Sequence, residues 1–233
     1  LARAIKNLYP KSKLAIGPTI EDGFYYDVES EEVISSDDLN KIEEEMKKII
    51  KSKSSITKKL VSKSEAMKVF KSNKEPYKEI IINESDQDDN FQLYYQEDEK
   101  FVDLCRGPHL PNLGFIGSFK LTKVSGAYWK GDSNNSMLTR IYGTAFNSDK
   151  DLQQHLDNLE EALKRDHRKL GKEMDLFHFQ DEAPGMVFWH PYGWNIYKTL
   201  QSFIRNKLDK NGYLEINTPQ VVDRKLWEAS GHW

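Results

Sequence analysis

The sequence predicts an α+β protein in which helices pack on an antiparallel sheet. The first observation is a set of short aromatic and aliphatic runs separated by turn-forming residues, such as residues 91–95 and 101–104 around the acidic turn at 97–99. The second is a set of amphipathic stripes at helical spacing between these runs, such as the apolar positions of residues 39–50. Because most runs are joined by short turns, we expect hairpins and therefore antiparallel pairing.

Composition predicts a heavily solvated globular protein. The 233 residues are 38% hydrophobic and 30% charged, and the formal net charge is -3. This charge gives no global reason to expect a nucleic-acid partner, so any RNA contact must come from local basic patches. No apolar run approaches the length of a membrane span, and we expect no membrane contact. The single cysteine excludes an internal disulfide and fits a reducing compartment, so we expect a cytoplasmic protein.

The other elements of the first 147 residues follow from local signals. Leu1, Ile5 and Leu8 recur at helical spacing and predict a helix that ends at the Tyr-Pro pair of residues 9–10. The remaining expected elements are strands at 14–18 and 23–28 joined by a tight turn at 21–23, a helix capped by Ser36, a lysine-bearing edge strand at 56–61, a helix from the capping box 62–65 through Phe70, a strand at 115–121 with a bend at 125–127, and a strand at 137–146.

The pattern changes after residue 147. An Asn-Ser pair at 147–148 precedes a stripe of leucines, which predicts one long connector helix over residues 148–172. Residues 173–233 are expected to begin a further domain. Its expected elements are an amphipathic helix that carries Tyr197, Leu200, Ile204 and Leu208 and ends at Asn211-Gly212, and a strand at 213–216 that is closed by Pro219. We therefore divide the chain into residues 1–147, 148–172 and 173–233.

The chemistry-bearing stretch is Asp-Leu-Cys-Arg-Gly-Pro-His at residues 103–109, which contains the only cysteine. Cys105 and His109 flank a Gly-Pro turn, and thiolate and imidazole are both zinc donors. A zinc centre needs at least one more protein ligand, and no other histidine lies in the first 145 residues. An apolar buried cysteine and a loop histidine would give the same letters, so both interpretations stay open.

Asp103 and Cys105 are two residues apart in an expected strand, so their side chains emerge on the same face. This shared face is the strongest argument for a site that comes from the residues themselves. Asp103 could instead orient Arg106 or cap a local turn, and the sequence does not choose between these roles.

Several motifs occur in a fixed order along the chain. They are Ala-Ile-Gly-Pro at 15–18, Gly-Phe-Tyr-Tyr-Asp at 23–27, the 103–109 stretch, Gly-Ala-Tyr-Trp-Lys-Gly-Asp at 126–132, and Met-Leu-Thr-Arg-Ile-Tyr-Gly-Thr-Ala-Phe at 137–146. In this order they resemble the editing domain of the threonyl-tRNA synthetase family. The long helix, Gly-Tyr pair, strand and proline that follow resemble motif 1 of class II synthetases. The resemblance implies an antiparallel-sheet editing domain of the type that threonyl and alanyl synthetases share, then a linker helix, then the start of a class II α/β catalytic domain.

The resemblance also implies a function: threonine–tRNA ligation with hydrolytic editing of mischarged seryl-tRNA. It implies catalytic roles in editing for Lys78, Asp103 and His109, and substrate binding by Tyr26 and Cys105. We expect direct attack by water rather than a side-chain nucleophile. The family carries a His-x-x-x-His pair on the first helix that does not occur in this sequence. We therefore expect Cys105 and His109 to be metal ligands without their partners, which bind zinc weakly or not at all.

The remaining implied ligands are the 3′ end of tRNA-Thr, threonine and serine. The resemblance implies a homodimer through motif 1, with Gly212, Tyr213 and Pro219 at its interface. A further zinc, ATP and Mg²⁺ are expected for the full-length enzyme, and this chain has no Gly-rich phosphate loop. Two alternatives stay open. One is a free-standing aminoacyl-tRNA deacylase of the alanyl-editing type, which would lack residues 148–233; the other is a non-catalytic RNA-binding or dimerisation fragment.

Overall fold

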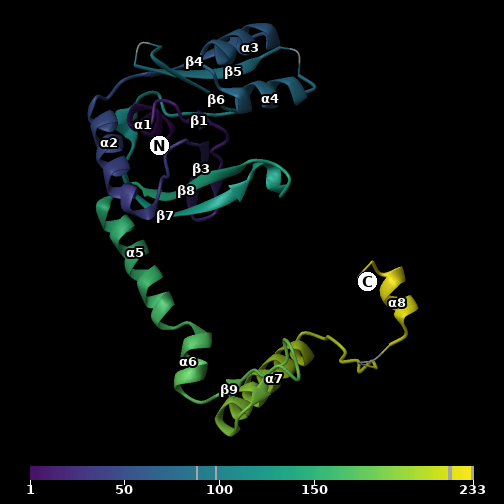
Figure 1. The fold of residues 1–233 in the computed structure, drawn as a ribbon. Helices are drawn as coiled ribbons and strands as arrows, with labels where there is room; N and C mark the ends of the chain where they lie inside the picture. Colours follow the sequence, from purple (N-terminus) through teal and green to yellow (C-terminus); the bar gives the residue numbers. More distant parts are fainter. Residues whose placement is uncertain (88, 98, 220–221, 232–233) are drawn as a thin grey trace. The chain divides into compact units, whose positions relative to one another are not determined.

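The computed structural model describes residues 1–233 except residues 88, 98, 220–221 and 232–233. The chain divides into two compact units, Leu1–Asp157 and Asn158–Trp233. Figure 1 labels most of the elements. Those before residue 147 are α1 (Ala2–Leu8), β1 (Lys13–Leu14), β2 (Thr19–Ile20), β3 (Gly23–Glu29), α2 (Leu39–Lys51), β4 (Ile56–Val61), α3 (Lys63–Ser72), α4 (Pro76–Glu84), β5 (Phe91–Gln96), β6 (Phe101–Leu104), β7 (Ser118–Tyr128) and β8 (Met137–Phe146). The later ones are α5 (Asp149–Lys164), α6 (His167–Glu173), β9 (Phe177–His178), β10 (Phe188–Trp189), α7 (Pro191–Lys210) and α8 (Arg224–Ala229).

A five-stranded antiparallel sheet forms one part of the first unit, in the order β1-β3-β8-β7, with β2 also paired to β3. β3 and β8 pair from Phe24↔Gly143 to Val28↔Thr139, and β7 and β8 form a long hairpin. α1 and α2 pack against this sheet through a shared apolar core that includes Ile5, Ile42 and Ile141. Helices on antiparallel strands are the arrangement that the sequence predicts, so the α+β class is confirmed.

A second antiparallel sheet has the order β4-β5-β6 and is covered by α3 and α4. The predicted hairpin forms, with Leu93 opposite Leu104 and Tyr94 opposite Asp103. Asp98, in the predicted turn of this hairpin, lies outside the described residues. The capping box before α3 is also confirmed, because Ser62 and Glu65 exchange side-chain and backbone hydrogen bonds.

The predicted cap before α2 was wrong by one residue. Ser35, rather than Ser36, accepts a hydrogen bond from the N–H of Asp37, and Asp38 completes a capping box across one 3-10 turn. Both serines can act as caps, and the choice depends on which one adopts an extended backbone. Ser35 does so, with φ of -115° and ψ of 178°.

The predicted strand at 115–121 and the bend at 125–127 also need correction. Leu113–Phe115 forms a 3-10 turn, and β7 then runs without a bend to Tyr128 because residues 125–127 pair in register with β8. The irregularity lies instead between Leu121 and Lys123. There the buried carboxylate of Glu43 on α2 accepts the backbone N–H of Leu121 at 2.8 Å. A buried helix carboxylate therefore supports the backbone at the bulge.

The single helix predicted over residues 148–172 is interrupted. Ser148 caps α5 as predicted, since its hydroxyl accepts the N–H of Asp151 at 3.1 Å. α5 then ends at Lys164, and α6 starts after Asp166, whose carboxylate accepts the N–H of Arg168 at 2.8 Å. Asp166 has an extended ψ of 120°, which is the backbone of a residue that begins a helix rather than continues one.

The second unit contains the β9–β10 hairpin and the long helix α7. α7 ends at Lys210 with Asn211 as its C-cap residue, where the stop was predicted, and Gly212 follows with φ of +77°, a left-handed conformation that favours glycine. The strand predicted at 213–216 is absent from the described residues. Leu214 and Ile216 are 90% and 80% exposed, and none of the strands in the described part of the chain pairs with this segment. An extended segment needs a neighbour to satisfy its backbone groups as a strand.

Candidate functional site

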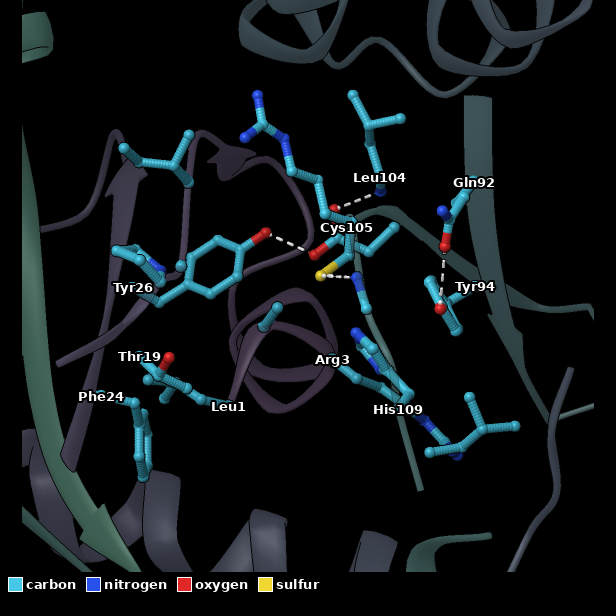
Figure 2. A pocket seen from close by; sticks show the side chains of 18 of the residues that line it. Leu1, Arg3, Thr19, Phe24, Tyr26, Gln92, Tyr94, Leu104, Cys105 and His109 are labelled. Atoms are coloured by element: carbon cyan, nitrogen blue, oxygen red, sulfur yellow. Dashed lines mark hydrogen bonds between the residues drawn. The ribbon is translucent and has the colours of Figure 1, made fainter. Parts of the chain in front are cut away.

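A cavity of about 1360 Å³ opens in the first unit between the five-stranded sheet and the β4-β5-β6 sheet. Figure 2 shows its interior, with Tyr26 of β3 on one side, Arg3 of α1 near His109 on the other, and Cys105 between them. All five residues predicted for the editing site line this cavity. They are Tyr26, Lys78, Asp103, Cys105 and His109. Residues from three separate parts of the chain, around positions 26, 78 and 103–109, therefore meet at one place.

Lys78 is delivered by the first turn of α4. Pro76 occupies the start of the helix and Glu75 precedes it as the N-cap residue. The Glu75 carboxylate is buried, accepts the backbone N–H of Leu14 at 2.6 Å and pairs with Lys6 at 2.8 Å. These bonds join the start of α4 to β1 and α1. Lys78 consequently points into the interior and is only 2% exposed.

Tyr26, Lys78 and Asp103 form a closed set of hydrogen bonds, which we call the triad. The Lys78 ammonium lies 2.6 Å from Asp103 Oδ1 and donates to the Tyr26 hydroxyl at 3.1 Å. The Tyr26 hydroxyl donates in turn to Asp103 Oδ2 at 2.6 Å. An ammonium has three donors and an ionised carboxylate about four acceptor positions. Lys78 therefore retains one N–H, and Asp103 retains acceptor capacity, for a bound ligand.

The triad fixes the protonation state of its tyrosine. Burial raises the pKa of Tyr26 well above its usual range, and the negative charge of Asp103, together with its hydrogen bond, raises it further. Tyr26 therefore remains a neutral phenol that donates to Asp103. Asp103 also accepts the N–H of Leu104, the next residue of β6, at 2.8 Å.

Cys105 and His109 form the loop part of the site. The N–H of Cys105 still pairs with Gln92 of β5 at 3.2 Å, which keeps its side chain on the face of Asp103 as predicted. Its sulfur accepts the N–H of Gly107 at 3.3 Å. The His109 ring stacks on Tyr94 with centroids 4.0 Å apart and planes 16° from parallel.

The position of the His109 ring has two consequences, one for its own pKa and one for the residue that position 107 can accept. Burial lowers the pKa of His109 below its ordinary value of 6.5, although the charge of Asp103 opposes this shift. The imidazole is therefore neutral near pH 7 and has a nitrogen free to accept a proton. Gly107 has φ of +63°, and a Cβ atom there would come within 1.9 Å of the Tyr94 hydroxyl. Tyr94 can lie beneath His109 only because this loop position has no side chain.

Sequence reasoning missed Tyr94 and Glu75. Tyr94 is directly opposite Asp103 in the β5–β6 register, so a correct hairpin register was the signal that could have placed it beside the site. Glu75 gave no comparable signal, because its partners Leu14 and Lys6 lie more than 60 residues away in the chain.

The described residues do not fit a zinc site. Within the part of the chain that the structure describes, no three His, Cys, Asp or Glu side chains come together in a way that could hold a metal ion. The Cys105 sulfur has a backbone N–H as its partner, and His109 is held by stacking. Cys105 and His109 therefore have other partners than a metal ion in this structure.

Among the helices of the described residues, none is both long and apolar enough to cross a membrane.

Comparison with known proteins gives consistent results. Residues 92–142 match the family described as threonyl and alanyl tRNA synthetase second additional domain. A threonine–tRNA ligase of Legionella pneumophila (strain Corby) is 57% identical over 233 residues. Those of Prochlorococcus marinus (strain MIT 9211) and Hahella chejuensis (strain KCTC 2396) are each 54% identical over the same length. In each case the match covers 100% of this chain and 36% of the relative.

Proposed function

Since the chain corresponds over its whole length to a part of the threonine–tRNA ligases, we propose that it is the editing portion of such an enzyme together with the start of its catalytic domain. The whole enzyme would attach threonine to tRNA-Thr at the expense of ATP. The portion at hand would hydrolyse seryl-tRNA-Thr. The observation that carries this proposal is the single cavity lined by Lys78, Asp103, Cys105 and His109.

Serine explains why such an enzyme needs an editing site. Serine is smaller than threonine by one methyl group, and a binding cavity rejects a smaller analogue by only about 1–3 kcal/mol per missing methylene. Mischarged seryl-tRNA must therefore be removed in a second place. A cavity that admits the serine ester and excludes the threonine ester provides this second sieve.

The polar groups of the cavity support ester hydrolysis by water. In our proposal the remaining N–H of Lys78 stabilises the oxyanion that develops on the ester carbonyl. Asp103, aided by Cys105 and Tyr26, receives the serine ammonium and hydroxyl. Neutral His109 accepts a proton as water attacks the carbonyl carbon. The ester C–O bond then breaks, the protonated His109 returns its proton to the 3′-oxygen of the terminal adenosine, and serine is released with its carboxyl group.

For the rest of the chain we propose a linker over residues 148–172 and the start of a class II catalytic domain over residues 173–233. In this assignment Gly212, Tyr213 and Pro219 belong to motif 1 and contribute to a homodimer. ATP, Mg²⁺ and the zinc of the synthetic site would bind to other parts of the ligase. Its partners would be tRNA-Thr, threonine and serine, and its compartment the cytoplasm.

The comparisons also bear on the two alternatives. A free-standing deacylase would have no counterpart of residues 148–233, whereas the threonine–tRNA ligases match all 233 residues. The alternative of a non-catalytic fragment concerns activity, so it is decided by experiment.

The test is made in the complete ligase. We expect Lys78→Met to slow hydrolysis of seryl-tRNA-Thr by about 100- to 1000-fold, the usual effect of removing a transition-state donor. Asp103→Asn should also slow it, because the serine ammonium then loses its carboxylate partner. Threonylation should be unchanged, because the ester site and the synthetic site are separate. Lys59→Met is the matched control, since this lysine pairs with Glu99 on the surface. Unchanged deacylation in both site variants would show that this cavity is not the editing site.

A further inference from the structure

Tyr26 of the triad lies opposite a glycine, Gly17, on the neighbouring segment of the sheet. β1 pairs with β3 at Leu14↔Val28, and β2 pairs with β3 at Thr19↔Phe24. Between these two pairs the β1–β2 segment advances five residues, from 14 to 19, whereas β3 advances four, from 28 to 24. The β1–β2 segment therefore contains one extra residue. The N–H of Tyr25 donates to the carbonyl of Pro18 at 3.3 Å. This bond makes residue 17 the cross-strand neighbour of residue 26. The two form a non-hydrogen-bonded pair, the type in which opposite side chains lie closest together.

The ring of Tyr26 occupies the space that a side chain at position 17 would fill. A Cβ atom built on Gly17 would lie 2.1 Å from Cδ2 and 2.5 Å from Cε2 of Tyr26. Both distances are far below van der Waals contact, so one of the two groups would have to move. The ring has little freedom to do so, because Tyr26 is only 8% exposed.

The position of the ring determines the position of its hydroxyl. This hydroxyl donates to Asp103 at 2.6 Å and accepts from Lys78 at 3.1 Å, so a displacement of about 1 Å would break at least one bond. We propose that Gly17 is a positioning residue of this site: because it has no side chain, the Tyr26 ring can pack against the backbone at position 17, where its hydroxyl reaches both Asp103 and Lys78. That hydrolysis depends on this arrangement rests on the proposed function; the placement of the ring does not.

Gly17 offers a clean test because its backbone needs no glycine. Its φ lies outside the left-handed range, in contrast to Gly107 at +63°. Alanine at position 17 would thus be tolerated by the backbone, and its effect would come from the contact with Tyr26. The matched control is Gly126→Ala on β7 of the same sheet, where the new Cβ would meet only the flexible Met137 side chain, at 3.0 Å from Sδ.

The first experiment measures the ring itself. Tyrosine labelled with ¹³C at Cζ is titrated by NMR in the wild-type protein, Gly17→Ala and Gly126→Ala. We expect the Tyr26 phenol to begin titrating near pH 10 in Gly17→Ala, because its burial and its bond to Asp103 are lost. It should resist titration in the wild type and in Gly126→Ala. A Tyr26 signal that is unchanged by Gly17→Ala overturns the proposal, whatever the function of the site.

The second experiment is a double-mutant cycle in the complete ligase. Gly17→Ala should lower kcat/KM for seryl-tRNA hydrolysis on the order of 100-fold, as expected for a 1 Å misplacement. In a Tyr26→Ala background the same change should have no further effect, because no ring remains to be displaced. An equal loss in both backgrounds overturns the proposal.

Folding is checked in the same set of variants. If Gly17→Ala does not fold, Gly17→Ala/Tyr26→Ala should fold, since the clash is removed; failure of the double variant to fold also overturns the proposal. The proposed function fails by a different result. In that case Gly17→Ala releases the phenol in the NMR titration, while deacylation is insensitive to Lys78→Met and Asp103→Asn.

Discussion

The two halves of the cavity are built differently. The triad takes each member from a regular element, with Tyr26 on β3, Lys78 on α4 and Asp103 on β6, and the three side chains bond to one another. Cys105 and His109 instead belong to a loop and have one main contact each, a backbone N–H and the Tyr94 ring. The triad is therefore part of the folded core, whereas the loop half depends on local contacts.

Because of this difference, variants of the two halves should differ in their effect on folding stability. A charge that is buried with its partner cannot lose that partner without a large loss of folding free energy. A loop side chain held by one weak contact can change with little effect on folding. Variants of the two halves should consequently differ in their effect on unfolding, even if both abolish the same reaction.

The largest effect is expected for Lys78→Met. Methionine fills the space of the lysine stem but leaves Asp103, whose side chain is 15% exposed, without its cation. Breaking a buried ion pair from one side typically costs about 3–5 kcal/mol. Denaturant unfolding followed by circular dichroism should show this loss in the transition of the first unit. Lys59→Met, which removes one member of an exposed pair, should leave that transition in place.

An equal shift of the transition for Lys78→Met and Lys59→Met would contradict the comparison. It would mean that the triad contributes no more to folding than an ion pair on the surface. The Tyr26 signal gives an independent reading, because loss of Lys78 also removes one hydrogen bond to the phenol.

A smaller effect is expected for His109, through pH. Its pKa is lowered in the folded protein, so the unfolded chain takes up a proton first as the pH falls. The stability that neutral His109 contributes is therefore complete above about pH 6.5 and is lost as the pH falls through its folded pKa. We expect the midpoint of urea unfolding to fall between pH 7.5 and pH 5.5 by more in the wild type than in His109→Gln.

Identical pH dependence in the two proteins would show that the surroundings of His109 do not lower its pKa. The Lys78→Met experiment is unaffected by that result, because its ion pair does not involve His109. The two measurements thus test the two halves separately.

Local signals in the sequence predicted most of the first unit. The capping box at Ser62, the β5–β6 hairpin and the shared face of Asp103 and Cys105 depend on neighbours a few residues apart, and the structure confirms them. The wrong predictions also concern neighbouring residues, but there two local structures are almost equally favourable. Ser35 and Ser36 are equally good caps, and the helix over residues 148–172 breaks where an aspartate begins a new turn.

The parts that could not be predicted depend on distant partners. Glu75 bonds to Leu14, 61 residues earlier, and nothing near Glu75 in the chain indicates this contact. Residues 213–216 have strand-forming composition, but a strand also needs a neighbour. Convergence of Lys78 with Asp103 was implied by resemblance to a family, since the spacing of these residues alone gives no such information.

The smallest effect is expected for Cys105→Ser. The thiol accepts the N–H of Gly107 at 3.3 Å, and a serine hydroxyl can accept the same bond. The free energy of unfolding should therefore change by less than about 0.5 kcal/mol. Cys105→Val keeps the approximate volume but removes the acceptor, and should cost about 0.5–1.5 kcal/mol. If serine destabilised the protein as much as Lys78→Met does, Cys105 would belong to the buried half of the cavity, and the distinction between a core triad and a locally held loop would be lost.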